Sequence, residues 1–169
     1  PYEHGLVDHR DLERASIPSH VAQISKLPRK DFDISNPNYR YIHSQAPMDH
    51  ETLQKIILRY YREKMSNKDK YTIKLGQYNE YGDEIITMQP TVVIVDSIPM
   101  IGNTLDYNDS KDVKKMEQAL SQMDAAHTAG AFKRVIKTVL GPMKEANIIL
   151  IGISHIGQKI ASNPIILNK

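Results

Sequence analysis

The chain has 169 residues, 40% of them hydrophobic and 25% charged, with a formal net charge of +2 at pH 7, which is ordinary for one globular domain with a hydrophobic core. The sequence has no cysteine, which excludes disulfides, thiolate metal sites and cysteine nucleophiles, and so small a net charge does not by itself indicate nucleic-acid binding. No apolar run approaches the roughly 18 residues of a membrane-spanning helix, and no signal-peptide pattern is present.

The first part of the chain predicts the end of a strand followed by two short helices. Glu3 stands in residues 2–8, which have no periodicity and are typical of a loop just past a strand, where a glutamate is usually simply solvated. Residues 8–16 have helical composition. A proline in the first turn favours a second helix over 18–27, with Ile24 on its apolar face.

The next segment predicts a strand and then an amphipathic helix. Residues 39–43 form a short β-type run, and Asp49 is a suitable N-cap for the helix that follows. Apolar side chains then recur at i, i+3, i+4 and i+7, which predicts a helix ending near Lys64. This apolar stripe consists of Leu53, Ile56, Ile57 and Tyr60.

An insertion over residues 66–90 predicts an antiparallel β-hairpin. Its two short strands are expected at 71–75 and 85–88, joined by a long loop that contains glycine. Two loop tyrosines, Tyr78 and Tyr81, suit stacking on nucleic-acid bases, but packing on the hairpin or on a neighbouring subunit is the more common role of such residues.

The most informative run begins at Thr91, where β-branched and other apolar residues lead to Asp96 and Ser97. Such a run predicts a strand buried on both faces of a parallel sheet. Ligands of open α/β sheets bind at the carboxyl ends of the strands, and an acid there suits Mg²⁺. Four apolar residues followed by aspartate form the Walker B pattern of nucleotide-hydrolysing enzymes, although an aspartate that only caps a helix gives the same pattern.

The remainder of the chain predicts helices and one more strand. Residues 105–111 are polar and acidic, which favours a loop, and apolar residues within 113–123 and 132–139 mark helical turns that Gly141-Pro142 should end. Residues 147–155 form a second apolar run that ends in Ser154-His155. Residues 157–169 have loop composition.

Polar side chains therefore follow three predicted strands. They are Glu3, the pair Asp96-Ser97 and the pair Ser154-His155. If the strands are parallel, these groups meet at one edge of the sheet. A carboxylate base, a second acid for a metal ion and an imidazole near a terminal phosphate suit nucleotide hydrolysis. The alternative is that His155 has only a structural role.

The ordered set of motifs resembles the RecA-type recombinases, most closely the phage UvsX-like branch, over nearly the whole chain. Residues 2–6 are similar to the family's segment with the catalytic glutamate, and 42–47 to its next strand and loop. Residues 93–97 resemble its Walker B strand, and 153–155 the strand whose final Gln or His senses the γ-phosphate. The resemblance implies an α/β fold, with a mostly parallel RecA-like sheet flanked by helices and the hairpin of residues 66–90 inserted.

The same resemblance implies roles for individual residues. Residues 1–169 would be a partial RecA-like ATPase core, with the first DNA-binding loop region at 105–128 and the second beginning at 157–169. The implied site residues are Glu3 as catalytic base, His155 as γ-phosphate sensor, Asp96 as metal-side acid, Ser97 and Arg10 as nucleotide-binding residues, and Gln158 and Lys159 as DNA contacts.

The sequence departs from the family in one decisive respect. No Gly-x-x-x-x-Gly-Lys-Ser/Thr phosphate loop occurs in these residues, so we expect them to be part of a longer protein and to be inactive alone. The intact protein is expected to be a DNA-dependent ATPase that uses ATP and Mg²⁺. It would form a helical filament on single-stranded DNA, exchange strands with double-stranded DNA and act in DNA repair, without membrane association, in the cytoplasm of a bacterial or phage-infected cell. A RecA-fold replicative helicase and a non-catalytic RecA-fold scaffold are the alternatives.

Overall fold

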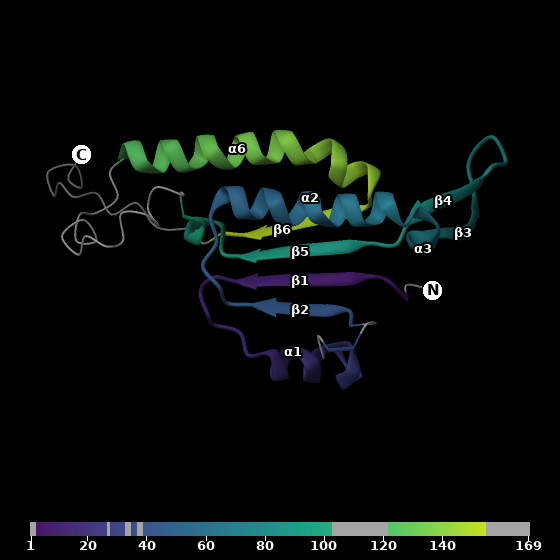
Figure 1. Cartoon of the computed structure of the whole chain (residues 1–169), viewed down its shortest axis with the longest axis horizontal. Coiled ribbons are helices and arrows are strands. Elements are labelled where there is room, and N and C mark those ends of the chain that lie inside the picture. Colours follow the sequence, from purple (N-terminus) through teal and green to yellow (C-terminus); the bar gives the residue numbers. More distant parts are fainter. Residues whose placement is uncertain (1–2, 27, 33–34, 37–38, 103–121, 155–169) are drawn as a thin grey trace, which may run out of the picture.

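The computed structural model describes residues 3–26, 28–32, 35–36, 39–102 and 122–154. They form an α/β structure with a four-stranded sheet, flanking helices and a separate two-stranded sheet (Figure 1). The elements in chain order are β1 Leu6–Asp11, α1 Pro18–Ser25, the 3-10 helix η1 Arg29–Phe32, β2 Tyr41–Ser44, α2 His50–Ser66, α3 Lys68–Tyr71, β3 Thr72–Tyr78, β4 Glu84–Met88, β5 Thr91–Asp96, the 3-10 helix η2 Ile98–Met100, α6 Gln122–Glu145 and β6 Ile148–Ile153.

The larger sheet has the strand order β2-β1-β5-β6, and all of its neighbouring strands are parallel. The predicted strands at 39–43, 91–96 and 147–155 are confirmed as β2, β5 and β6. Asp11 pairs in register with Asp96, and Asp96 pairs with Ile153, so these strands end at one edge. We call this the carboxyl edge.

Strand β1 corrects the prediction of a helix over residues 8–16. The charged residues of β1 make the segment unlike a typical strand in the sequence, but each of them has an interaction partner in the folded structure. The Arg10 guanidinium lies 2.7 Å from the Asp8 carboxylate, and the Tyr60 hydroxyl donates to the same carboxylate at 2.6 Å. With β2 and β5 on either side, β1 also has backbone partners along both edges. These tertiary interactions outweigh the local helical preference.

Helices α2 and α6 cover one face of the parallel sheet (Figure 1). The side chain of Asp49 caps α2 by accepting a hydrogen bond from the Thr52 N–H at 2.7 Å, as predicted. The predicted apolar stripe of α2 is buried and packs on β5 and α6 in one core. Fully or almost fully buried members of this core are Leu53, Ile57, Val93, Val95 and Val139.

Helix α6 is longer than the sequence predicts, because it continues through Gly141-Pro142 to Glu145. Proline lacks the N–H that would continue the helical ladder, which is why a stop was expected. Burial on both sides of the proline keeps the helix in place: Val139 and Ala146 are fully buried, and Met143 packs against the core. The Ala146 N–H donates to the Pro142 carbonyl at 3.0 Å.

The opposite face of the sheet is more open than predicted. In β5, Val93 and Val95 are buried while Val92 and Ile94 are only half-buried, so the expected burial on both faces is wrong. Residues of β6 on this second face are exposed, namely Ile149, Ile151 and Ile153. Helix α1 confirms the predicted helix start at its proline, and Ile24 on its apolar face is 81% exposed.

Strands β3 and β4 pair antiparallel and confirm the predicted hairpin. It projects beyond the amino ends of the parallel strands (Figure 1). The polar turn expected over 66–70 is a short helix, α3, whose last residue, Tyr71, is buried. The Tyr71 hydroxyl donates to Glu63 of α2 at 2.6 Å and anchors the base of the hairpin.

Within the described ranges, no helix is both long and apolar enough to cross a membrane. Residues 122–128 of the predicted first DNA-binding loop region belong to α6. The rest of the first predicted DNA-binding region and all of the second fall within residues 103–121 and 155–169, which lie outside the described residues.

Candidate functional site

Acidic side chains gather at the carboxyl edge where β1 and β5 end. After Asp11, the chain turns around the tip of β5, and the N–H groups of Leu12 and Glu13 donate to the Asp96 carbonyl at 2.5 and 3.3 Å. The Ser97 hydroxyl donates to the Glu13 carboxylate at 2.5 Å. The peptide bond between Asp96 and Ser97 is cis. The hydrogen bonds hold Glu13 beside the end of β5, although no sequence pattern selected it.

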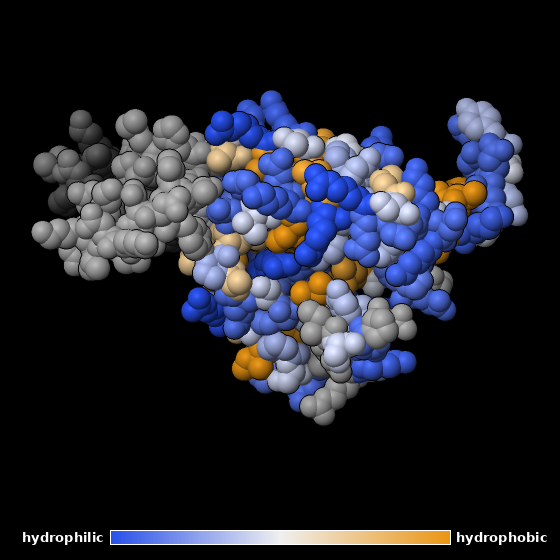
Figure 2. All heavy atoms as spheres, in the orientation of Figure 1, coloured by the Kyte–Doolittle hydropathy of each residue, from blue (hydrophilic) through white to orange (hydrophobic). Residues whose placement is uncertain are grey.

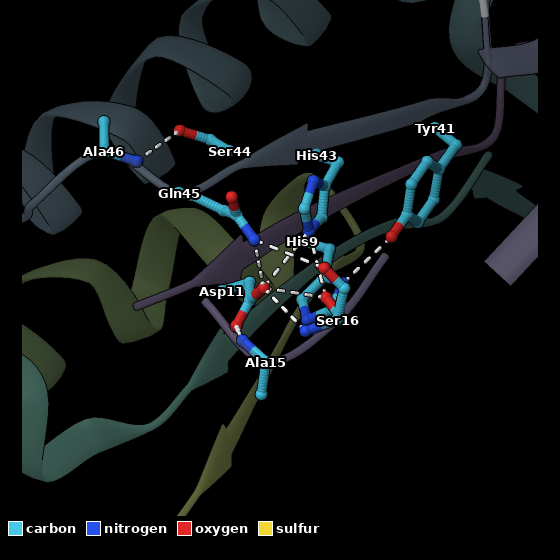
Figure 3. Close-up of polar contacts among 9 residues, drawn as sticks. All are labelled: His9, Asp11, Ala15, Ser16, Tyr41, His43, Ser44, Gln45 and Ala46. Atoms are coloured by element: carbon cyan, nitrogen blue, oxygen red, sulfur yellow. Dashed lines mark hydrogen bonds and ion pairs between the residues drawn. The ribbon is translucent and has the colours of Figure 1, made fainter. Parts of the chain in front are cut away.

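The buried Asp11 carboxylate supports this turn (Figure 3). It accepts hydrogen bonds from the N–H of Ala15 at 3.1 Å, from the N–H and hydroxyl of Ser16 at 3.0 and 2.9 Å, and from the Gln45 amide at 2.8 Å. Burial alone would raise the pKa of Asp11, but the hydrogen bonds from Gln45 and Ser16 outweigh it and hold the pKa well below its ordinary value. Asp11 is therefore an ionised anchor for the chain around Glu13.

Histidines of β1 and β2 extend this network across the second face of the sheet (Figure 3). His9 Nδ1 lies 2.9 Å from the Tyr41 hydroxyl. Burial, together with the nearby His43, lowers the pKa of His9. The Ser16 hydroxyl lies 3.0 Å from His43 Nε2, and the Asp11 carboxylate lies 3.5 Å from the same nitrogen. A nucleophilic serine needs its base oriented through the other ring nitrogen, so this group does not form a catalytic triad.

A close backbone approach positions the chain just beyond Asp96. Ile98 packs directly over Gly152 of β6, where a Cβ atom would collide with the Ile98 side chain. The glycine therefore makes room for the segment that leaves the carboxyl edge. Ser97, at its start, is almost fully buried.

Glu3 does not belong to this group. It lies just before β1, and it is exposed at the amino edge of the sheet. The N–H of His4 donates to the Gln89 side chain at 2.7 Å, and the N–H of Leu6 donates to the Pro90 carbonyl at 3.1 Å, which ties this segment to the start of β5. The expected meeting of Glu3 and Asp96 at one edge is therefore wrong: the two lie at opposite ends of the strands.

Arg10 is also poorly placed for stacking on a base. Its guanidinium pairs with the fully buried Asp8, and its side chain is only 16% exposed. A base-stacking role needs an open guanidinium face, which this placement does not provide. Ser154 directly follows β6 at the carboxyl edge, but His155, Gln158 and Lys159 lie outside the described residues.

The donor set at the carboxyl edge suits a hard divalent cation. Among the described residues, no three His, Asp or Glu side chains are grouped closely enough to hold a metal ion on their own. Mg²⁺ usually keeps several waters and binds through one or two carboxylates together with nucleotide phosphates. Asp96 and Glu13 are therefore compatible with a magnesium ion that is shared with a nucleotide.

Sequence reasoning found Asp96 and Ser97 but missed Glu13, Asp11 and Gln45. The available signal was the acid-rich stretch Asp11-Leu12-Glu13, which begins at the last residue of the six-residue segment; that segment itself shows no strict alternation of buried and exposed positions. Reading that segment as helical removed the strand end and with it the acidic turn.

Comparisons of the chain with protein-family models, with curated proteins and with solved structures found no match.

Proposed function

We propose that residues 1–169 belong to the ATPase core of a RecA-type, DNA-dependent recombinase. The observation that carries this proposal is the Glu13 carboxylate, which Ser97 holds beside the end of β5 and next to Asp96. Parallel α/β sheets bind ligands at this edge, and nucleotide hydrolysis uses a carboxylate there together with a metal-binding acid. The strand order β2-β1-β5-β6 supports the same assignment, since it places the two acidic strand ends side by side.

In this proposal Glu13, and not Glu3, is the general base. A carboxylate that accepts a proton from water makes that water a better nucleophile toward the terminal phosphate of ATP. The hydroxyl of Ser97 fixes one oxygen of Glu13, which leaves the carboxylate oriented at the edge. Asp11 is a positioning residue, because it holds the backbone of Ala15 and Ser16 just after Glu13.

Asp96 is the metal-side acid. Bound Mg²⁺ would neutralise charge on the phosphates. The Asp96 backbone carbonyl accepts from the turn that carries Glu13, and the Asp96 side chain would be the group that holds the ion. The acid at the end of β5 and the base in the turn after β1 would then lie near the same phosphate.

The remaining roles follow from the family resemblance and are proposed with it. His155 would sense the γ-phosphate, and Gln158 and Lys159 would contact the DNA backbone. Single-stranded DNA would bind inside a helical filament of many copies, and double-stranded DNA would be the partner for strand exchange. Because residues 1–169 contain no phosphate-binding loop, we expect hydrolysis only when such a loop is present in the same protein.

The test compares two glutamate-to-glutamine variants of the intact protein. Glu13→Gln should lower the DNA-stimulated rate of ATP hydrolysis by on the order of 100-fold or more, because the base is lost while the size and the hydrogen bonding of the side chain are kept. Glu3→Gln is the matched control at the amino edge and should leave the rate unchanged. Full activity of Glu13→Gln would refute the assignment, and so would loss of activity only in Glu3→Gln.

Electron microscopy with ATP and single-stranded DNA separates the proposed recombinase from a helicase of the same fold. Open helical filaments support the recombinase, and closed rings would replace it with the helicase. A protein with neither assembly nor ATPase activity would be the scaffold.

A further inference from the structure

The β3–β4 hairpin is a projecting element with an exposed end. Figure 2 shows it standing out from the rest of the molecule with apolar residues on its flank. At its tip, Tyr78 is 67% exposed and Tyr81 is 81% exposed, and Ile86 on its side is 57% exposed. Two-stranded hairpins are only marginally stable in water unless they pack on something, so such exposure marks a binding element.

The tip is ordered in advance of any contact. The side-chain oxygen of Asn79 accepts hydrogen bonds from the N–H groups of Tyr81 and Asp83, both at 2.9 Å. The Gly82 N–H donates to the Asn79 carbonyl at 3.0 Å, and Gly82 has a φ of +84°, which glycine adopts without strain. A loop that is already ordered loses little conformational entropy when it binds.

The charge of the tip is negative. Glu80 and Asp83 flank Tyr81, and Glu84 forms an ion pair with Lys74 at 2.8 Å. Acidic residues repel phosphates, so this tip does not suit a nucleic-acid backbone. It suits a basic protein surface that offers an apolar spot for the tyrosine ring.

Helix α6 carries such a surface. Lys133, Lys137, Leu140 and Lys144 follow one another at spacings of four, three and four residues, which places them on one side of the helix. All four are exposed, and Leu140 is 61% exposed between two lysines. No ion pair between described residues involves these lysines. We call this row the α6 stripe.

We propose that the hairpin tip of one copy docks on the α6 stripe of a second copy. Tyr81 packs on Leu140, while Glu80 and Asp83 pair with Lys137 and Lys144, which lie about 10 Å apart along the helix axis. The two surfaces differ, so the contact is head-to-tail and extends into a ring or a helical polymer. The inference rests on the proposed filament-forming function, for which it supplies a subunit contact.

Charge reversal tests the contact by sedimentation without ATP or DNA, so that its outcome is independent of catalysis. The tip variant Glu80→Lys/Asp83→Lys and the stripe variant Lys137→Glu/Lys144→Glu should each weaken self-association by about tenfold or more, since like charges then face each other. An equimolar mixture of the two variants should associate again, because the basic tip of the first variant meets the acidic stripe of the second, and the acidic tip of the second meets the basic stripe of the first. Tyr81→Ala should also weaken association with the fold unchanged, as judged by circular dichroism.

Three results would overturn the contact. They are unchanged association of both variants, failure of the mixture to associate, or a tip variant that loses only its binding to single-stranded DNA. The Glu13→Gln protein should associate like the wild type. If Glu13→Gln loses ATPase activity but associates normally, or keeps ATPase activity but fails to associate, the result distinguishes the proposed enzyme from the proposed contact.

Discussion

Replacing Lys64 with methionine should remove a pH dependence of stability that this buried amine creates. Lys64 is only 2% exposed, and its ammonium group donates to the carbonyls of Gln89 and Ala146 at 2.6 and 2.8 Å. Burial lowers the pKa of Lys64 from 10.5 to about 8, although the carboxylate of Glu63 raises it. Below pH 8 the amine is charged in the folded and unfolded chains alike, and the folded protein bears the full penalty of burying that charge.

Between pH 8 and 10.5 the folded protein has lost this proton and the unfolded chain still binds it. The free energy of unfolding therefore rises with pH in this window. A difference of 10.5 − 8 = 2.5 pKa units corresponds to about 3 kcal/mol at 1.36 kcal/mol per unit. Lys64→Met lacks this term, so the wild type should gain stability relative to the variant as the pH rises.

The assay is urea unfolding of both proteins at pH 7, 8, 9 and 10, followed by circular dichroism. Burial raises the pKa values of Tyr60 and Tyr71, but those tyrosines are present in both proteins and their effect largely cancels in the difference. Lys70→Met, which removes an exposed amine nearby, is the matched control and should show no such trend. A difference between wild type and Lys64→Met that stays flat from pH 7 to 10 would refute this account of the buried amine.

Two further substitutions test the chain around the carboxyl edge. Asp11→Asn should destabilise the protein by about 2–4 kcal/mol at pH 7, because several donors lose a charged acceptor. Since the pKa of Asp11 is lowered in the folded protein, this loss of stability should shrink as the pH falls below about 4. Equal losses at pH 3 and pH 7, measured by thermal unfolding, would count against this role of Asp11. Gly152→Ala should cost about 1–3 kcal/mol through collision with Ile98, and the cost should fall in an Ile98→Ala background; an equal cost in both backgrounds would show that the two residues do not clash.

Periodicity and capping predicted the helix whose signals are local in the sequence, and apolar runs predicted strands of the parallel sheet. The α2 stripe follows from helical spacing, its cap follows from an aspartate just before the first turn, and β5 and β6 follow from apolar runs. The hairpin followed from two short strands around a glycine-containing loop. In each case, neighbours in the sequence carry the information that the fold uses.

Strand β1 could not be predicted in this way because its charges are satisfied by distant residues. Asp8 accepts from Tyr60, 52 positions along the chain, and Asp11 accepts from Gln45, 34 positions along. Without those partners the segment looks too polar for a central strand. The error carried over to the candidate site, since the strand end that presents Glu13 was read as a helix and Glu3 took its place.

The most direct test of the central claim is to locate the metal–nucleotide complex on the intact protein. Mn²⁺ takes the same oxygen ligands as Mg²⁺ and broadens the NMR signals of nearby nuclei. Mn²⁺ with ATP should broaden the amide signals of Leu12, Ala15 and Ser97 at the carboxyl edge and leave those of His4 and Leu6 at the amino edge sharp. Broadening confined to the amino edge, or absent from both edges at saturating nucleotide, would contradict the assignment of Glu13 and Asp96 to a nucleotide-hydrolysing site.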